Sequence, residues 1–245
     1  MRIRGRSVLA VVVLAGLGAL VVWAATGLTD FGTPSGPANG VTRTLALKRQ
    51  AANAVNGVTY DLRGVDTLGE ELILFVAAVG SAVLLRHRRS EEVEEEEKES
   101  GPRVPDTLRV AGAVLVGPVV VLGVYVVTHG HLGPGGGFQG GIMLASGLLL
   151  VYAAGQVLAL ERVEPLALVE VAESAGALAY VLVAVGGLVF AGVALFNFLP
   201  FGTNGQLLSS GTIAVLSVAV GVEVTGAVAL ILTEFLDQTL LHGGE

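Results

Sequence analysis

The sequence has no cysteine among its 245 residues and carries few charged side chains for its length. The absence of cysteine excludes disulfide bonds, thiolate metal ligands and cysteine nucleophiles. Charged residues make up 14% of the chain, whereas soluble domains carry about a quarter, and 53% of the residues are hydrophobic. The basic residues form no patch that could bind nucleic acid. These shortages indicate a protein of the lipid bilayer.

Long apolar runs predict an all-α integral membrane protein with about six transmembrane helices, two and then four. A bilayer core about 30 Å thick needs about 20 apolar residues per helix. The first run, residues 8–25, is longer than the apolar part of a secretory signal peptide, so we interpret it as a retained span. The second run, 72–85, is too short alone, and its helix must begin near Thr67. The other four runs are 108–128, 138–160, 173–199 and 209–235.

Composition divides the chain into a two-span unit at residues 1–90, an acidic linker at 91–104 and a four-span domain at 105–245. The linker holds a run of glutamates from Glu91 to Glu99, and such a block of like charge repels itself and stays solvated. Before the second span, a short surface helix is expected over residues 45–55.

The basic residues predict the orientation of these spans. With the N-terminus inside, ten of the 14 basic residues lie on the inner side, and the others are Arg43, Lys48, Arg49 and Arg63. This asymmetry agrees with the positive-inside rule. It places both termini and the acidic linker inside and His131 outside.

Two glutamates at the start of the second span are candidates for an ion path. Because that helix must begin early, Glu70 and Glu71 are drawn towards the membrane. Asp66 or Thr67 can cap the helix, and Glu70 lies in its first turn, where the helix dipole favours negative charge.

Glu223 stands in the middle of the last span and is a third candidate. An ionisable residue at that depth costs at least about 2.5 kcal/mol on insertion scales and is by default a functional candidate. The alternative is a structural carboxyl that bonds Thr225 or a neighbouring helix, or that is kept protonated by apolar surroundings. Four other acidic residues are interpreted as an interfacial pair or as solvated helix ends: Glu170 with Glu173, and Glu234 with Asp237.

A glycine-rich stretch at residues 129–141, HGHLGPGGGFQGG, joins two predicted spans. The simplest interpretation is a tight turn, because glycine permits positive φ and close backbone approach. His129 and His131 leave a tetrahedral metal ion two ligands short. Both could relay protons at a surface, or they could cap a helix end or hydrogen-bond the turn. The lysine and Ser/Thr of a phosphate-binding loop are missing. Glycines four residues apart, Gly136 with Gly140 and Gly137 with Gly141, indicate an assembly surface.

These residues resemble a known signature. Gly130-His131, Pro134-Gly135-Gly136-Gly137-Phe138 and Gly140-Gly141 are similar to the motif of the B-type subunit of multisubunit Mrp-type sodium/proton antiporters. The same domain resembles a subunit of the related membrane-bound hydrogenases. The resemblance covers residues 104–241, and its motif is long and specific.

The first unit resembles a different subunit. Residues 61–70, DLRGVDTLGE, are similar to a segment at the C-terminal end of the large A-type subunit of the same antiporters. Leu62 and Val65 stand where that segment has aromatic residues, and Glu71 stands where an apolar residue is usual. The chain therefore resembles a small two-span unit fused through the acidic linker to a B-type subunit.

The resemblance implies an accessory subunit of a sodium/proton antiporter in the cytoplasmic membrane of a prokaryote. It implies no enzyme activity and no cofactor. The partners would be large complex-I-like subunits and small membrane subunits, and the ions would be sodium and protons. No lysine lies within a predicted span, whereas the family's pumping subunits use lysine and glutamate. The candidates for an ion path are Glu70, Glu71, Glu223, Asp66 and His131, and the packing motif is Pro134, Gly135, Gly136, Gly137, Phe138, Gly140 and Gly141.

Three alternatives remain at this point. The chain could be a subunit of a hydrogenase or related respiratory complex, or a self-contained small proton-coupled transporter that uses Glu223 and Glu70. It could also be a structural scaffold whose carboxyl groups conduct nothing. Few polar groups are available in the predicted spans for a private substrate pathway, which favours a subunit over a self-contained transporter.

Overall fold

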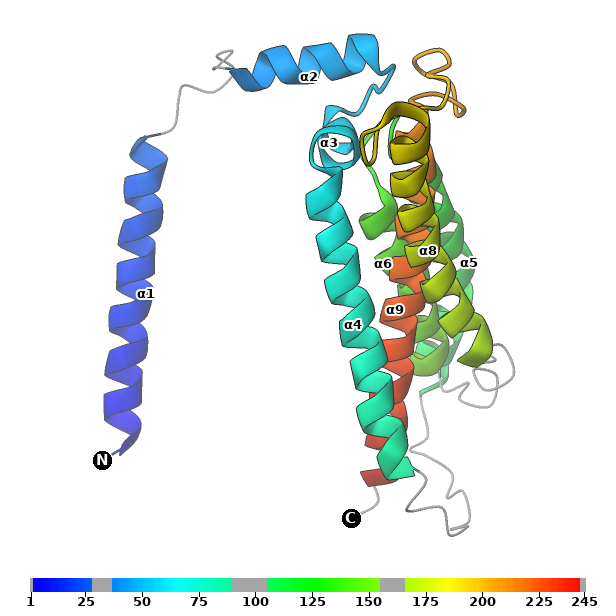
Figure 1. Ribbon diagram of the computed structural model, residues 1–245. Coiled ribbons are helices and arrows are strands. Elements are labelled where there is room, and N and C mark those ends of the chain that lie inside the picture. The colour runs from blue at the N-terminus through cyan, green and yellow to red at the C-terminus, as the bar shows by residue number, and fades with distance from the viewer. Residues whose placement is uncertain (1, 28–36, 90–104, 155–165, 243–245) are drawn as a thin grey trace. The chain divides into compact units, whose positions relative to one another are not determined.

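The computed structural model describes residues 2–27, 37–89, 105–154 and 166–242, and all regular structure in these ranges is helical. It forms two compact units, Met1–Val41 and Thr42–Glu245 (Figure 1). The first unit holds α1 (Arg2–Thr26) and the start of α2 (Pro37–Lys48). The second continues with α3 (Ala54–Gly57), the π-helical turn η1 (Val58–Leu62), α4 (Gly64–Arg89), α5 (Asp106–Thr128), α6 (Gly137–Ala153), α8 (Leu166–Ala191) and α9 (Thr212–His242).

Four of these helices are long and apolar enough to cross a membrane, namely α4, α5, α8 and α9. The apolar parts of α1 and α6 are shorter, Val12–Thr26 and Gly137–Val151. The all-helical prediction is thus confirmed for the described residues, whereas the count of six spans stays a prediction. The predicted end of the fourth span, at residue 160, lies outside the described residues.

Helix α9 is the central element of the second unit. It packs against α4, α6 and α8, which lie around it in Figure 1, and it also contacts α5. Small residues such as Ala219, Gly221 and Ala227 are buried along α9, so neighbouring backbones can approach closely. Because α4 joins this packing, the second predicted span belongs to the same compact unit as the helices that follow the acidic linker.

The glycines of the motif make this packing close. A β-carbon on Gly141 would lie 2.9 Å from the Gly221 carbonyl oxygen of α9, and one on Gly140 would lie 2.8 Å from the Gly123 carbonyl oxygen of α5. We expected one glycine face turned towards a partner subunit. Instead, Gly137 and Gly141 face α9 and Gly140 faces α5, because successive positions of a helix point in different directions.

Two predicted helix boundaries are wrong. Helix α8 ends at Ala191, not at residue 199, because Gly192 and Leu195 have positive φ values of 73° and 59° that stop the helix. The chain then returns irregularly to α9, whose first N–H groups lack intrahelical partners. The Asn197 side chain satisfies one of them by accepting a hydrogen bond from the Thr212 amide at 2.8 Å.

The expected surface helix over residues 45–55 is interrupted after Lys48, because Gln50 has a φ of 55°. The chain then crosses one end of the bundle. Asn53 Nδ2 donates to the carbonyls of Gly130 and Gly133, both at 2.7 Å, and the Ser210 hydroxyl donates to the Gln50 carbonyl at 2.9 Å. We call this end, formed by residues 49–53, 129–136 and 192–211, the loop end.

Candidate functional site

Two carboxyl groups meet inside the bundle. Glu71 lies in the second turn of α4 and Glu223 in the middle of α9, and their exposed fractions are 1% and 0%. The two carboxyl groups act on each other electrostatically. All four of their oxygen atoms are enclosed, and none has a hydrogen-bond partner among the described residues. Because two like charges enclosed side by side cannot both be tolerated, at least one of the two carboxyl groups carries a proton.

A third carboxyl group approaches this pair from α8. Glu173 is 2% exposed, and its electrostatic influence reaches Glu223. Its helix comes close because Gly176 lies against the backbone of Glu223 and Gly226 lies against the backbone of Glu173. The interpretation of Glu173 as half of an interfacial pair missed this convergence, because sequence alone does not say which helices are neighbours.

The arrangement is suited to holding and releasing a proton. Removing an ionised carboxylate from water costs several kcal/mol, and two like charges in contact cannot both be tolerated. A proton on one of the two removes the repulsion between them and leaves at most one buried charge. Among the described residues, no group of three or more His, Asp or Glu side chains could hold a metal ion.

The other predicted acidic residues lie elsewhere. Glu70 is exposed beside Glu71, and the Asp66 side chain is 55% exposed and bonds Arg63 Nε at 2.7 Å. The expected cap by Thr67 is wrong, because its hydroxyl donates to the Thr59 carbonyl.

Glu234, expected to be solvated, is 4% exposed, and the side chain of Asp237 lies outside the described residues. The hydroxyl of Thr225 donates to the Gly221 carbonyl and not to Glu223.

His131 is buried at the loop end, with 1% exposure, so the expectation of a water-facing imidazole is wrong. The reason is that residues of the 192–211 segment cover it, with the backbone of Gln206 and Leu207 facing the ring. Neither ring nitrogen makes a well-formed hydrogen bond to a described residue. Burial lowers the pKa of His131, which keeps the imidazole neutral near pH 7.

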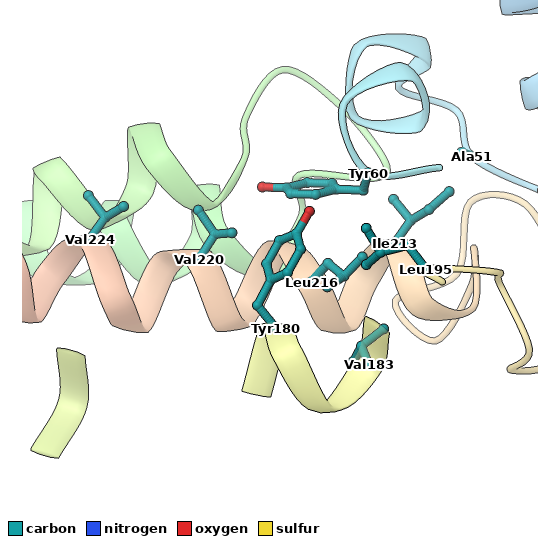
Figure 2. Close-up of a cluster of buried hydrophobic side chains, with 9 residues drawn as sticks. All are labelled: Ala51, Tyr60, Tyr180, Val183, Leu195, Ile213, Leu216, Val220 and Val224. Carbon is teal, nitrogen blue, oxygen red and sulfur yellow. The ribbon is translucent and has the colours of Figure 1, made fainter. Parts of the chain in front are cut away.

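Two buried tyrosines lie between the loop end and the carboxyl pair. Tyr60 of η1 and Tyr180 of α8 belong to one cluster on α9, and the hydroxyl of Tyr180 points towards Tyr60 (Figure 2). The Tyr180 hydroxyl donates to the Gly64 carbonyl at 2.9 Å. Sequence reasoning missed both residues, since a tyrosine in an apolar stretch carries no signal beyond its hydrophobicity.

The fold and the site define a polytopic membrane protein that encloses a protonated carboxyl pair between its helices. Residues 107–230 match the family described as a domain related to the MnhB subunit of the Na⁺/H⁺ antiporter. The chain belongs to this family.

Two curated relatives are similar to the chain. An uncharacterized protein of Methanocaldococcus jannaschii is 32% identical over 194 residues, which cover 70% of this chain and 72% of that protein. A probable K⁺/H⁺ antiporter A/B subunit of Rhizobium meliloti is 33% identical over 122 residues, 42% of this chain. The match spans only 12% of the Rhizobium protein.

Two solved complexes contain chains with the same fold. A chain of the membrane-bound sulfane sulfur reductase, an archaeal respiratory membrane complex, superimposes with a TM-score of 0.72 and 30% identity. The match covers 91% of this chain and 97% of that one. A chain of the Mrp complex from Dietzia sp. DQ12-45-1b gives a TM-score of 0.71 and 25% identity, over 96% of this chain and 26% of that one.

Proposed function

We propose that the chain is an accessory subunit of a multisubunit cation/proton antiporter. The observation that carries this proposal is the Glu71–Glu223 pair, a single-proton site enclosed within the membrane-spanning part of a family member. The antiporter relatives from Rhizobium and Dietzia support it. The chain contributes no enzymatic step, and it moves protons as part of a larger assembly in a prokaryotic cytoplasmic membrane.

The proposed ion path runs through the carboxyl groups. Glu71 and Glu223 hold the proton, and Glu173 on α8 is the next carboxyl group of the path. Glu70 is the candidate for exchange with a neighbouring subunit, because its carboxylate is exposed on a helix of membrane-spanning length. Asp66 lies nearer the loop end than the carboxyl pair does, and His131 is part of the loop end. Both would act at the entrance of the ion path.

A respiratory complex is the second candidate for the assembly. One observation favours it, namely that this chain covers 97% of a separate chain in the sulfane sulfur reductase complex. The carboxyl pair has the same role in either assembly, since cation and proton movement are what the site can support.

Co-purification tests which assembly is present. We expect the full chain, tagged and extracted in mild detergent from its own cells, to elute with large membrane subunits and small hydrophobic subunits. Elution with redox subunits as well would favour the respiratory complex. Elution of the chain alone, with undiminished transport in reconstituted vesicles, would contradict a subunit role.

The proposal includes the orientation of the chain in the membrane. Both termini and residues 90–104 lie inside and the loop end lies outside, as the basic residues predict. Because the native chain has no cysteine, labelling of a Ser100→Cys variant from outside intact cells would overturn this orientation.

A further inference from the structure

Helix α4 has one covered face and one open face. The covered face carries Glu71, Ala78 and Ala82, which are buried where α4 packs against α9. The opposite face lies on one side of a helix with 3.6 residues per turn and is formed by Gly69, Ile73, Val76, Gly80 and Val83. Ile73, Val76 and Val83 are 72%, 67% and 64% exposed. We call this set of residues the open face of α4.

The glycines of the open face have no neighbour in the part of the chain that the structure describes. A β-carbon on Gly69 or Gly80 would have no atom within 4 Å. Other helical glycines serve close packing, as at Gly112 of α5, where a β-carbon would lie 2.9 Å from the Leu150 carbonyl oxygen of α6. Because glycine weakens the interior of a helix, it is expected where a neighbour needs its bare surface. A helix from outside this chain would give Gly69 and Gly80 that use.

Glu70 lies at the edge of the open face, since residues three apart on a helix, such as Glu70 and Ile73, are neighbours. It stands six residues beyond the start of α4, about 9 Å along the helix. Its side chain is exposed, and no described residue forms an ion pair with it. A carboxyl group without a partner at that depth is costly when lipid surrounds it.

The other exposed charged side chains described in α4, α5, α8 and α9 lie in the first turn of a helix and are paired, namely Asp66 with Arg63 and Asp106 with Arg109. Gly117 of α5 is open like Gly69, but its neighbours on that side of the helix, Val114 and Val121, are aliphatic. Lipid can cover such a face. The carboxyl group of Glu70 therefore distinguishes the open face of α4.

A transmembrane helix of a partner subunit suits this face better than lipid does. The same fold occurs in chains of two multisubunit membrane complexes, in which helices of other subunits are available. Acyl chains offer neither a charge nor a hydrogen-bond donor, whereas a basic side chain supplies both to a carboxylate. The bare glycines let the backbone of such a helix approach closely.

We propose that the open face of α4 is the docking site for a transmembrane helix of a partner subunit, and that this helix places a basic side chain against Glu70. The two backbones approach at Gly69 and Gly80, and the aliphatic side chains of the open face pack beside them. This inference rests on the proposed function and names the surface by which the subunit joins its assembly. It also brings the partner helix to the residue that precedes Glu71 of the carboxyl pair.

Cross-linking in the assembled complex identifies the occupant of the open face. A photoreactive benzophenone side chain is introduced in place of Ile73, and the complex is irradiated in native membranes. We expect a covalent product that joins this chain to a partner subunit through a peptide of a transmembrane segment. A product of two copies of this chain, or products with lipid alone, would overturn the docking site.

Two matched pairs of variants test the glycine and the carboxylate. Gly80→Leu and Gly117→Leu add the same side chain at open glycines, and Glu70→Lys and Asp106→Lys reverse the same charge at exposed side chains. We expect Gly80→Leu and Glu70→Lys to lower the yield of complex on a native gel severalfold, and the two controls to assemble normally. The melting temperature of the isolated chain should not fall in Gly80→Leu, because the new β-carbon has no atom within 4 Å.

The outcomes separate the docking site from the proposed function. Normal assembly of Gly80→Leu or of Glu70→Lys would refute the docking site and leave the proposed function intact. Equal losses in Gly80→Leu and Gly117→Leu would also refute it, since bulk at any open glycine would then hinder assembly. Elution of the wild-type chain alone, with undiminished transport, would instead refute the proposed function itself.

Discussion

At the scale of single residues, the burial of Glu71 and Glu223 carries a large energetic cost. Each would lose several kcal/mol of hydration as an ion, and neither has a cationic partner among the described residues. The repulsion between them is avoided only while at least one carboxyl group keeps its proton. Such a pair can exchange one proton with a proton donor or acceptor that comes into contact with it. This exchange is the physical basis for its proposed role.

The imidazole of His131 predicts a dependence of stability on pH. In the unfolded chain its pKa is the ordinary 6.5, and burial lowers it in the folded chain. As the pH falls below about 6.5, the unfolded state therefore binds the proton first and the folded state loses stability. We expect the melting temperature of the purified protein to fall between about pH 7.5 and pH 5.5, and to fall less in a His131→Gln variant. Equal slopes for the two proteins would show that His131 is not buried as a neutral group.

Single residues were predicted unevenly from the sequence. Glu71 and Glu223 stood out because carboxyl groups are rare in spans, but nothing in the sequence paired them. Tyr60 and Tyr180 were missed, because they are buried together by packing between η1, α8 and α9, which are far apart in the chain. His131 was placed correctly in a turn but wrongly in water, since its cover comes from residues 206–207.

At the scale of helices, the glycine motif acts inside the chain. Gly140 meets α5, and Gly137 and Gly141 meet α9, so α6 is held between two helices of the same unit. The spacing of the glycines correctly indicated close packing, but it could not indicate which helix is the neighbour. The assembly surface for partner subunits stays a prediction.

Substitution at Gly140 tests this internal packing. A β-carbon there would lie 2.7 Å from the Val127 amide nitrogen and 2.8 Å from the Gly123 carbonyl oxygen, and backbone atoms cannot move aside easily. We expect Gly140→Leu to destabilise the isolated chain by about 1–3 kcal/mol, the usual cost of overpacking. Gly117→Leu is the control, because no atom lies within 4 Å of the new β-carbon. Thermal unfolding in detergent measures both, and an unchanged Gly140→Leu chain that fails only to bind partners would restore the assembly interpretation.

Helix ends were harder to predict than helix existence. The apolar run continues past Ala191, so hydropathy extended α8 to residue 199. After Ala191 the chain folds back on α8, so that the ring of Phe198 lies against Gly186 and the backbone of Leu195 and Phe196 lies against Gly187. Such a return depends on side-chain and backbone atoms filling the bare faces of glycines, which a count of apolar residues does not register.

At the scale of the whole molecule, α4 and the family domain form one body. The predicted division at the acidic linker follows composition, whereas the compact unit Thr42–Glu245 includes α4 and the carboxyl pair shared by α4 and α9. We propose that the two parts correspond to regions of two antiporter subunits joined in one chain, a proposal that the match to the A/B subunit of Rhizobium meliloti supports. The proton site exists only where the two parts meet.

The most direct test of the account compares proton flux in vesicles carrying Glu71→Gln, Glu223→Gln and the double variant. We expect each single variant to lower cation-dependent flux about tenfold or more and the double variant to be no slower, because the pair works as one unit around one proton. Asp106→Asn, at a side chain that is 90% exposed, is the control and should transport normally. Native gels must show equal amounts of complex. Wild-type flux in the single variants, or losses that multiply in the double variant, would contradict a shared proton site.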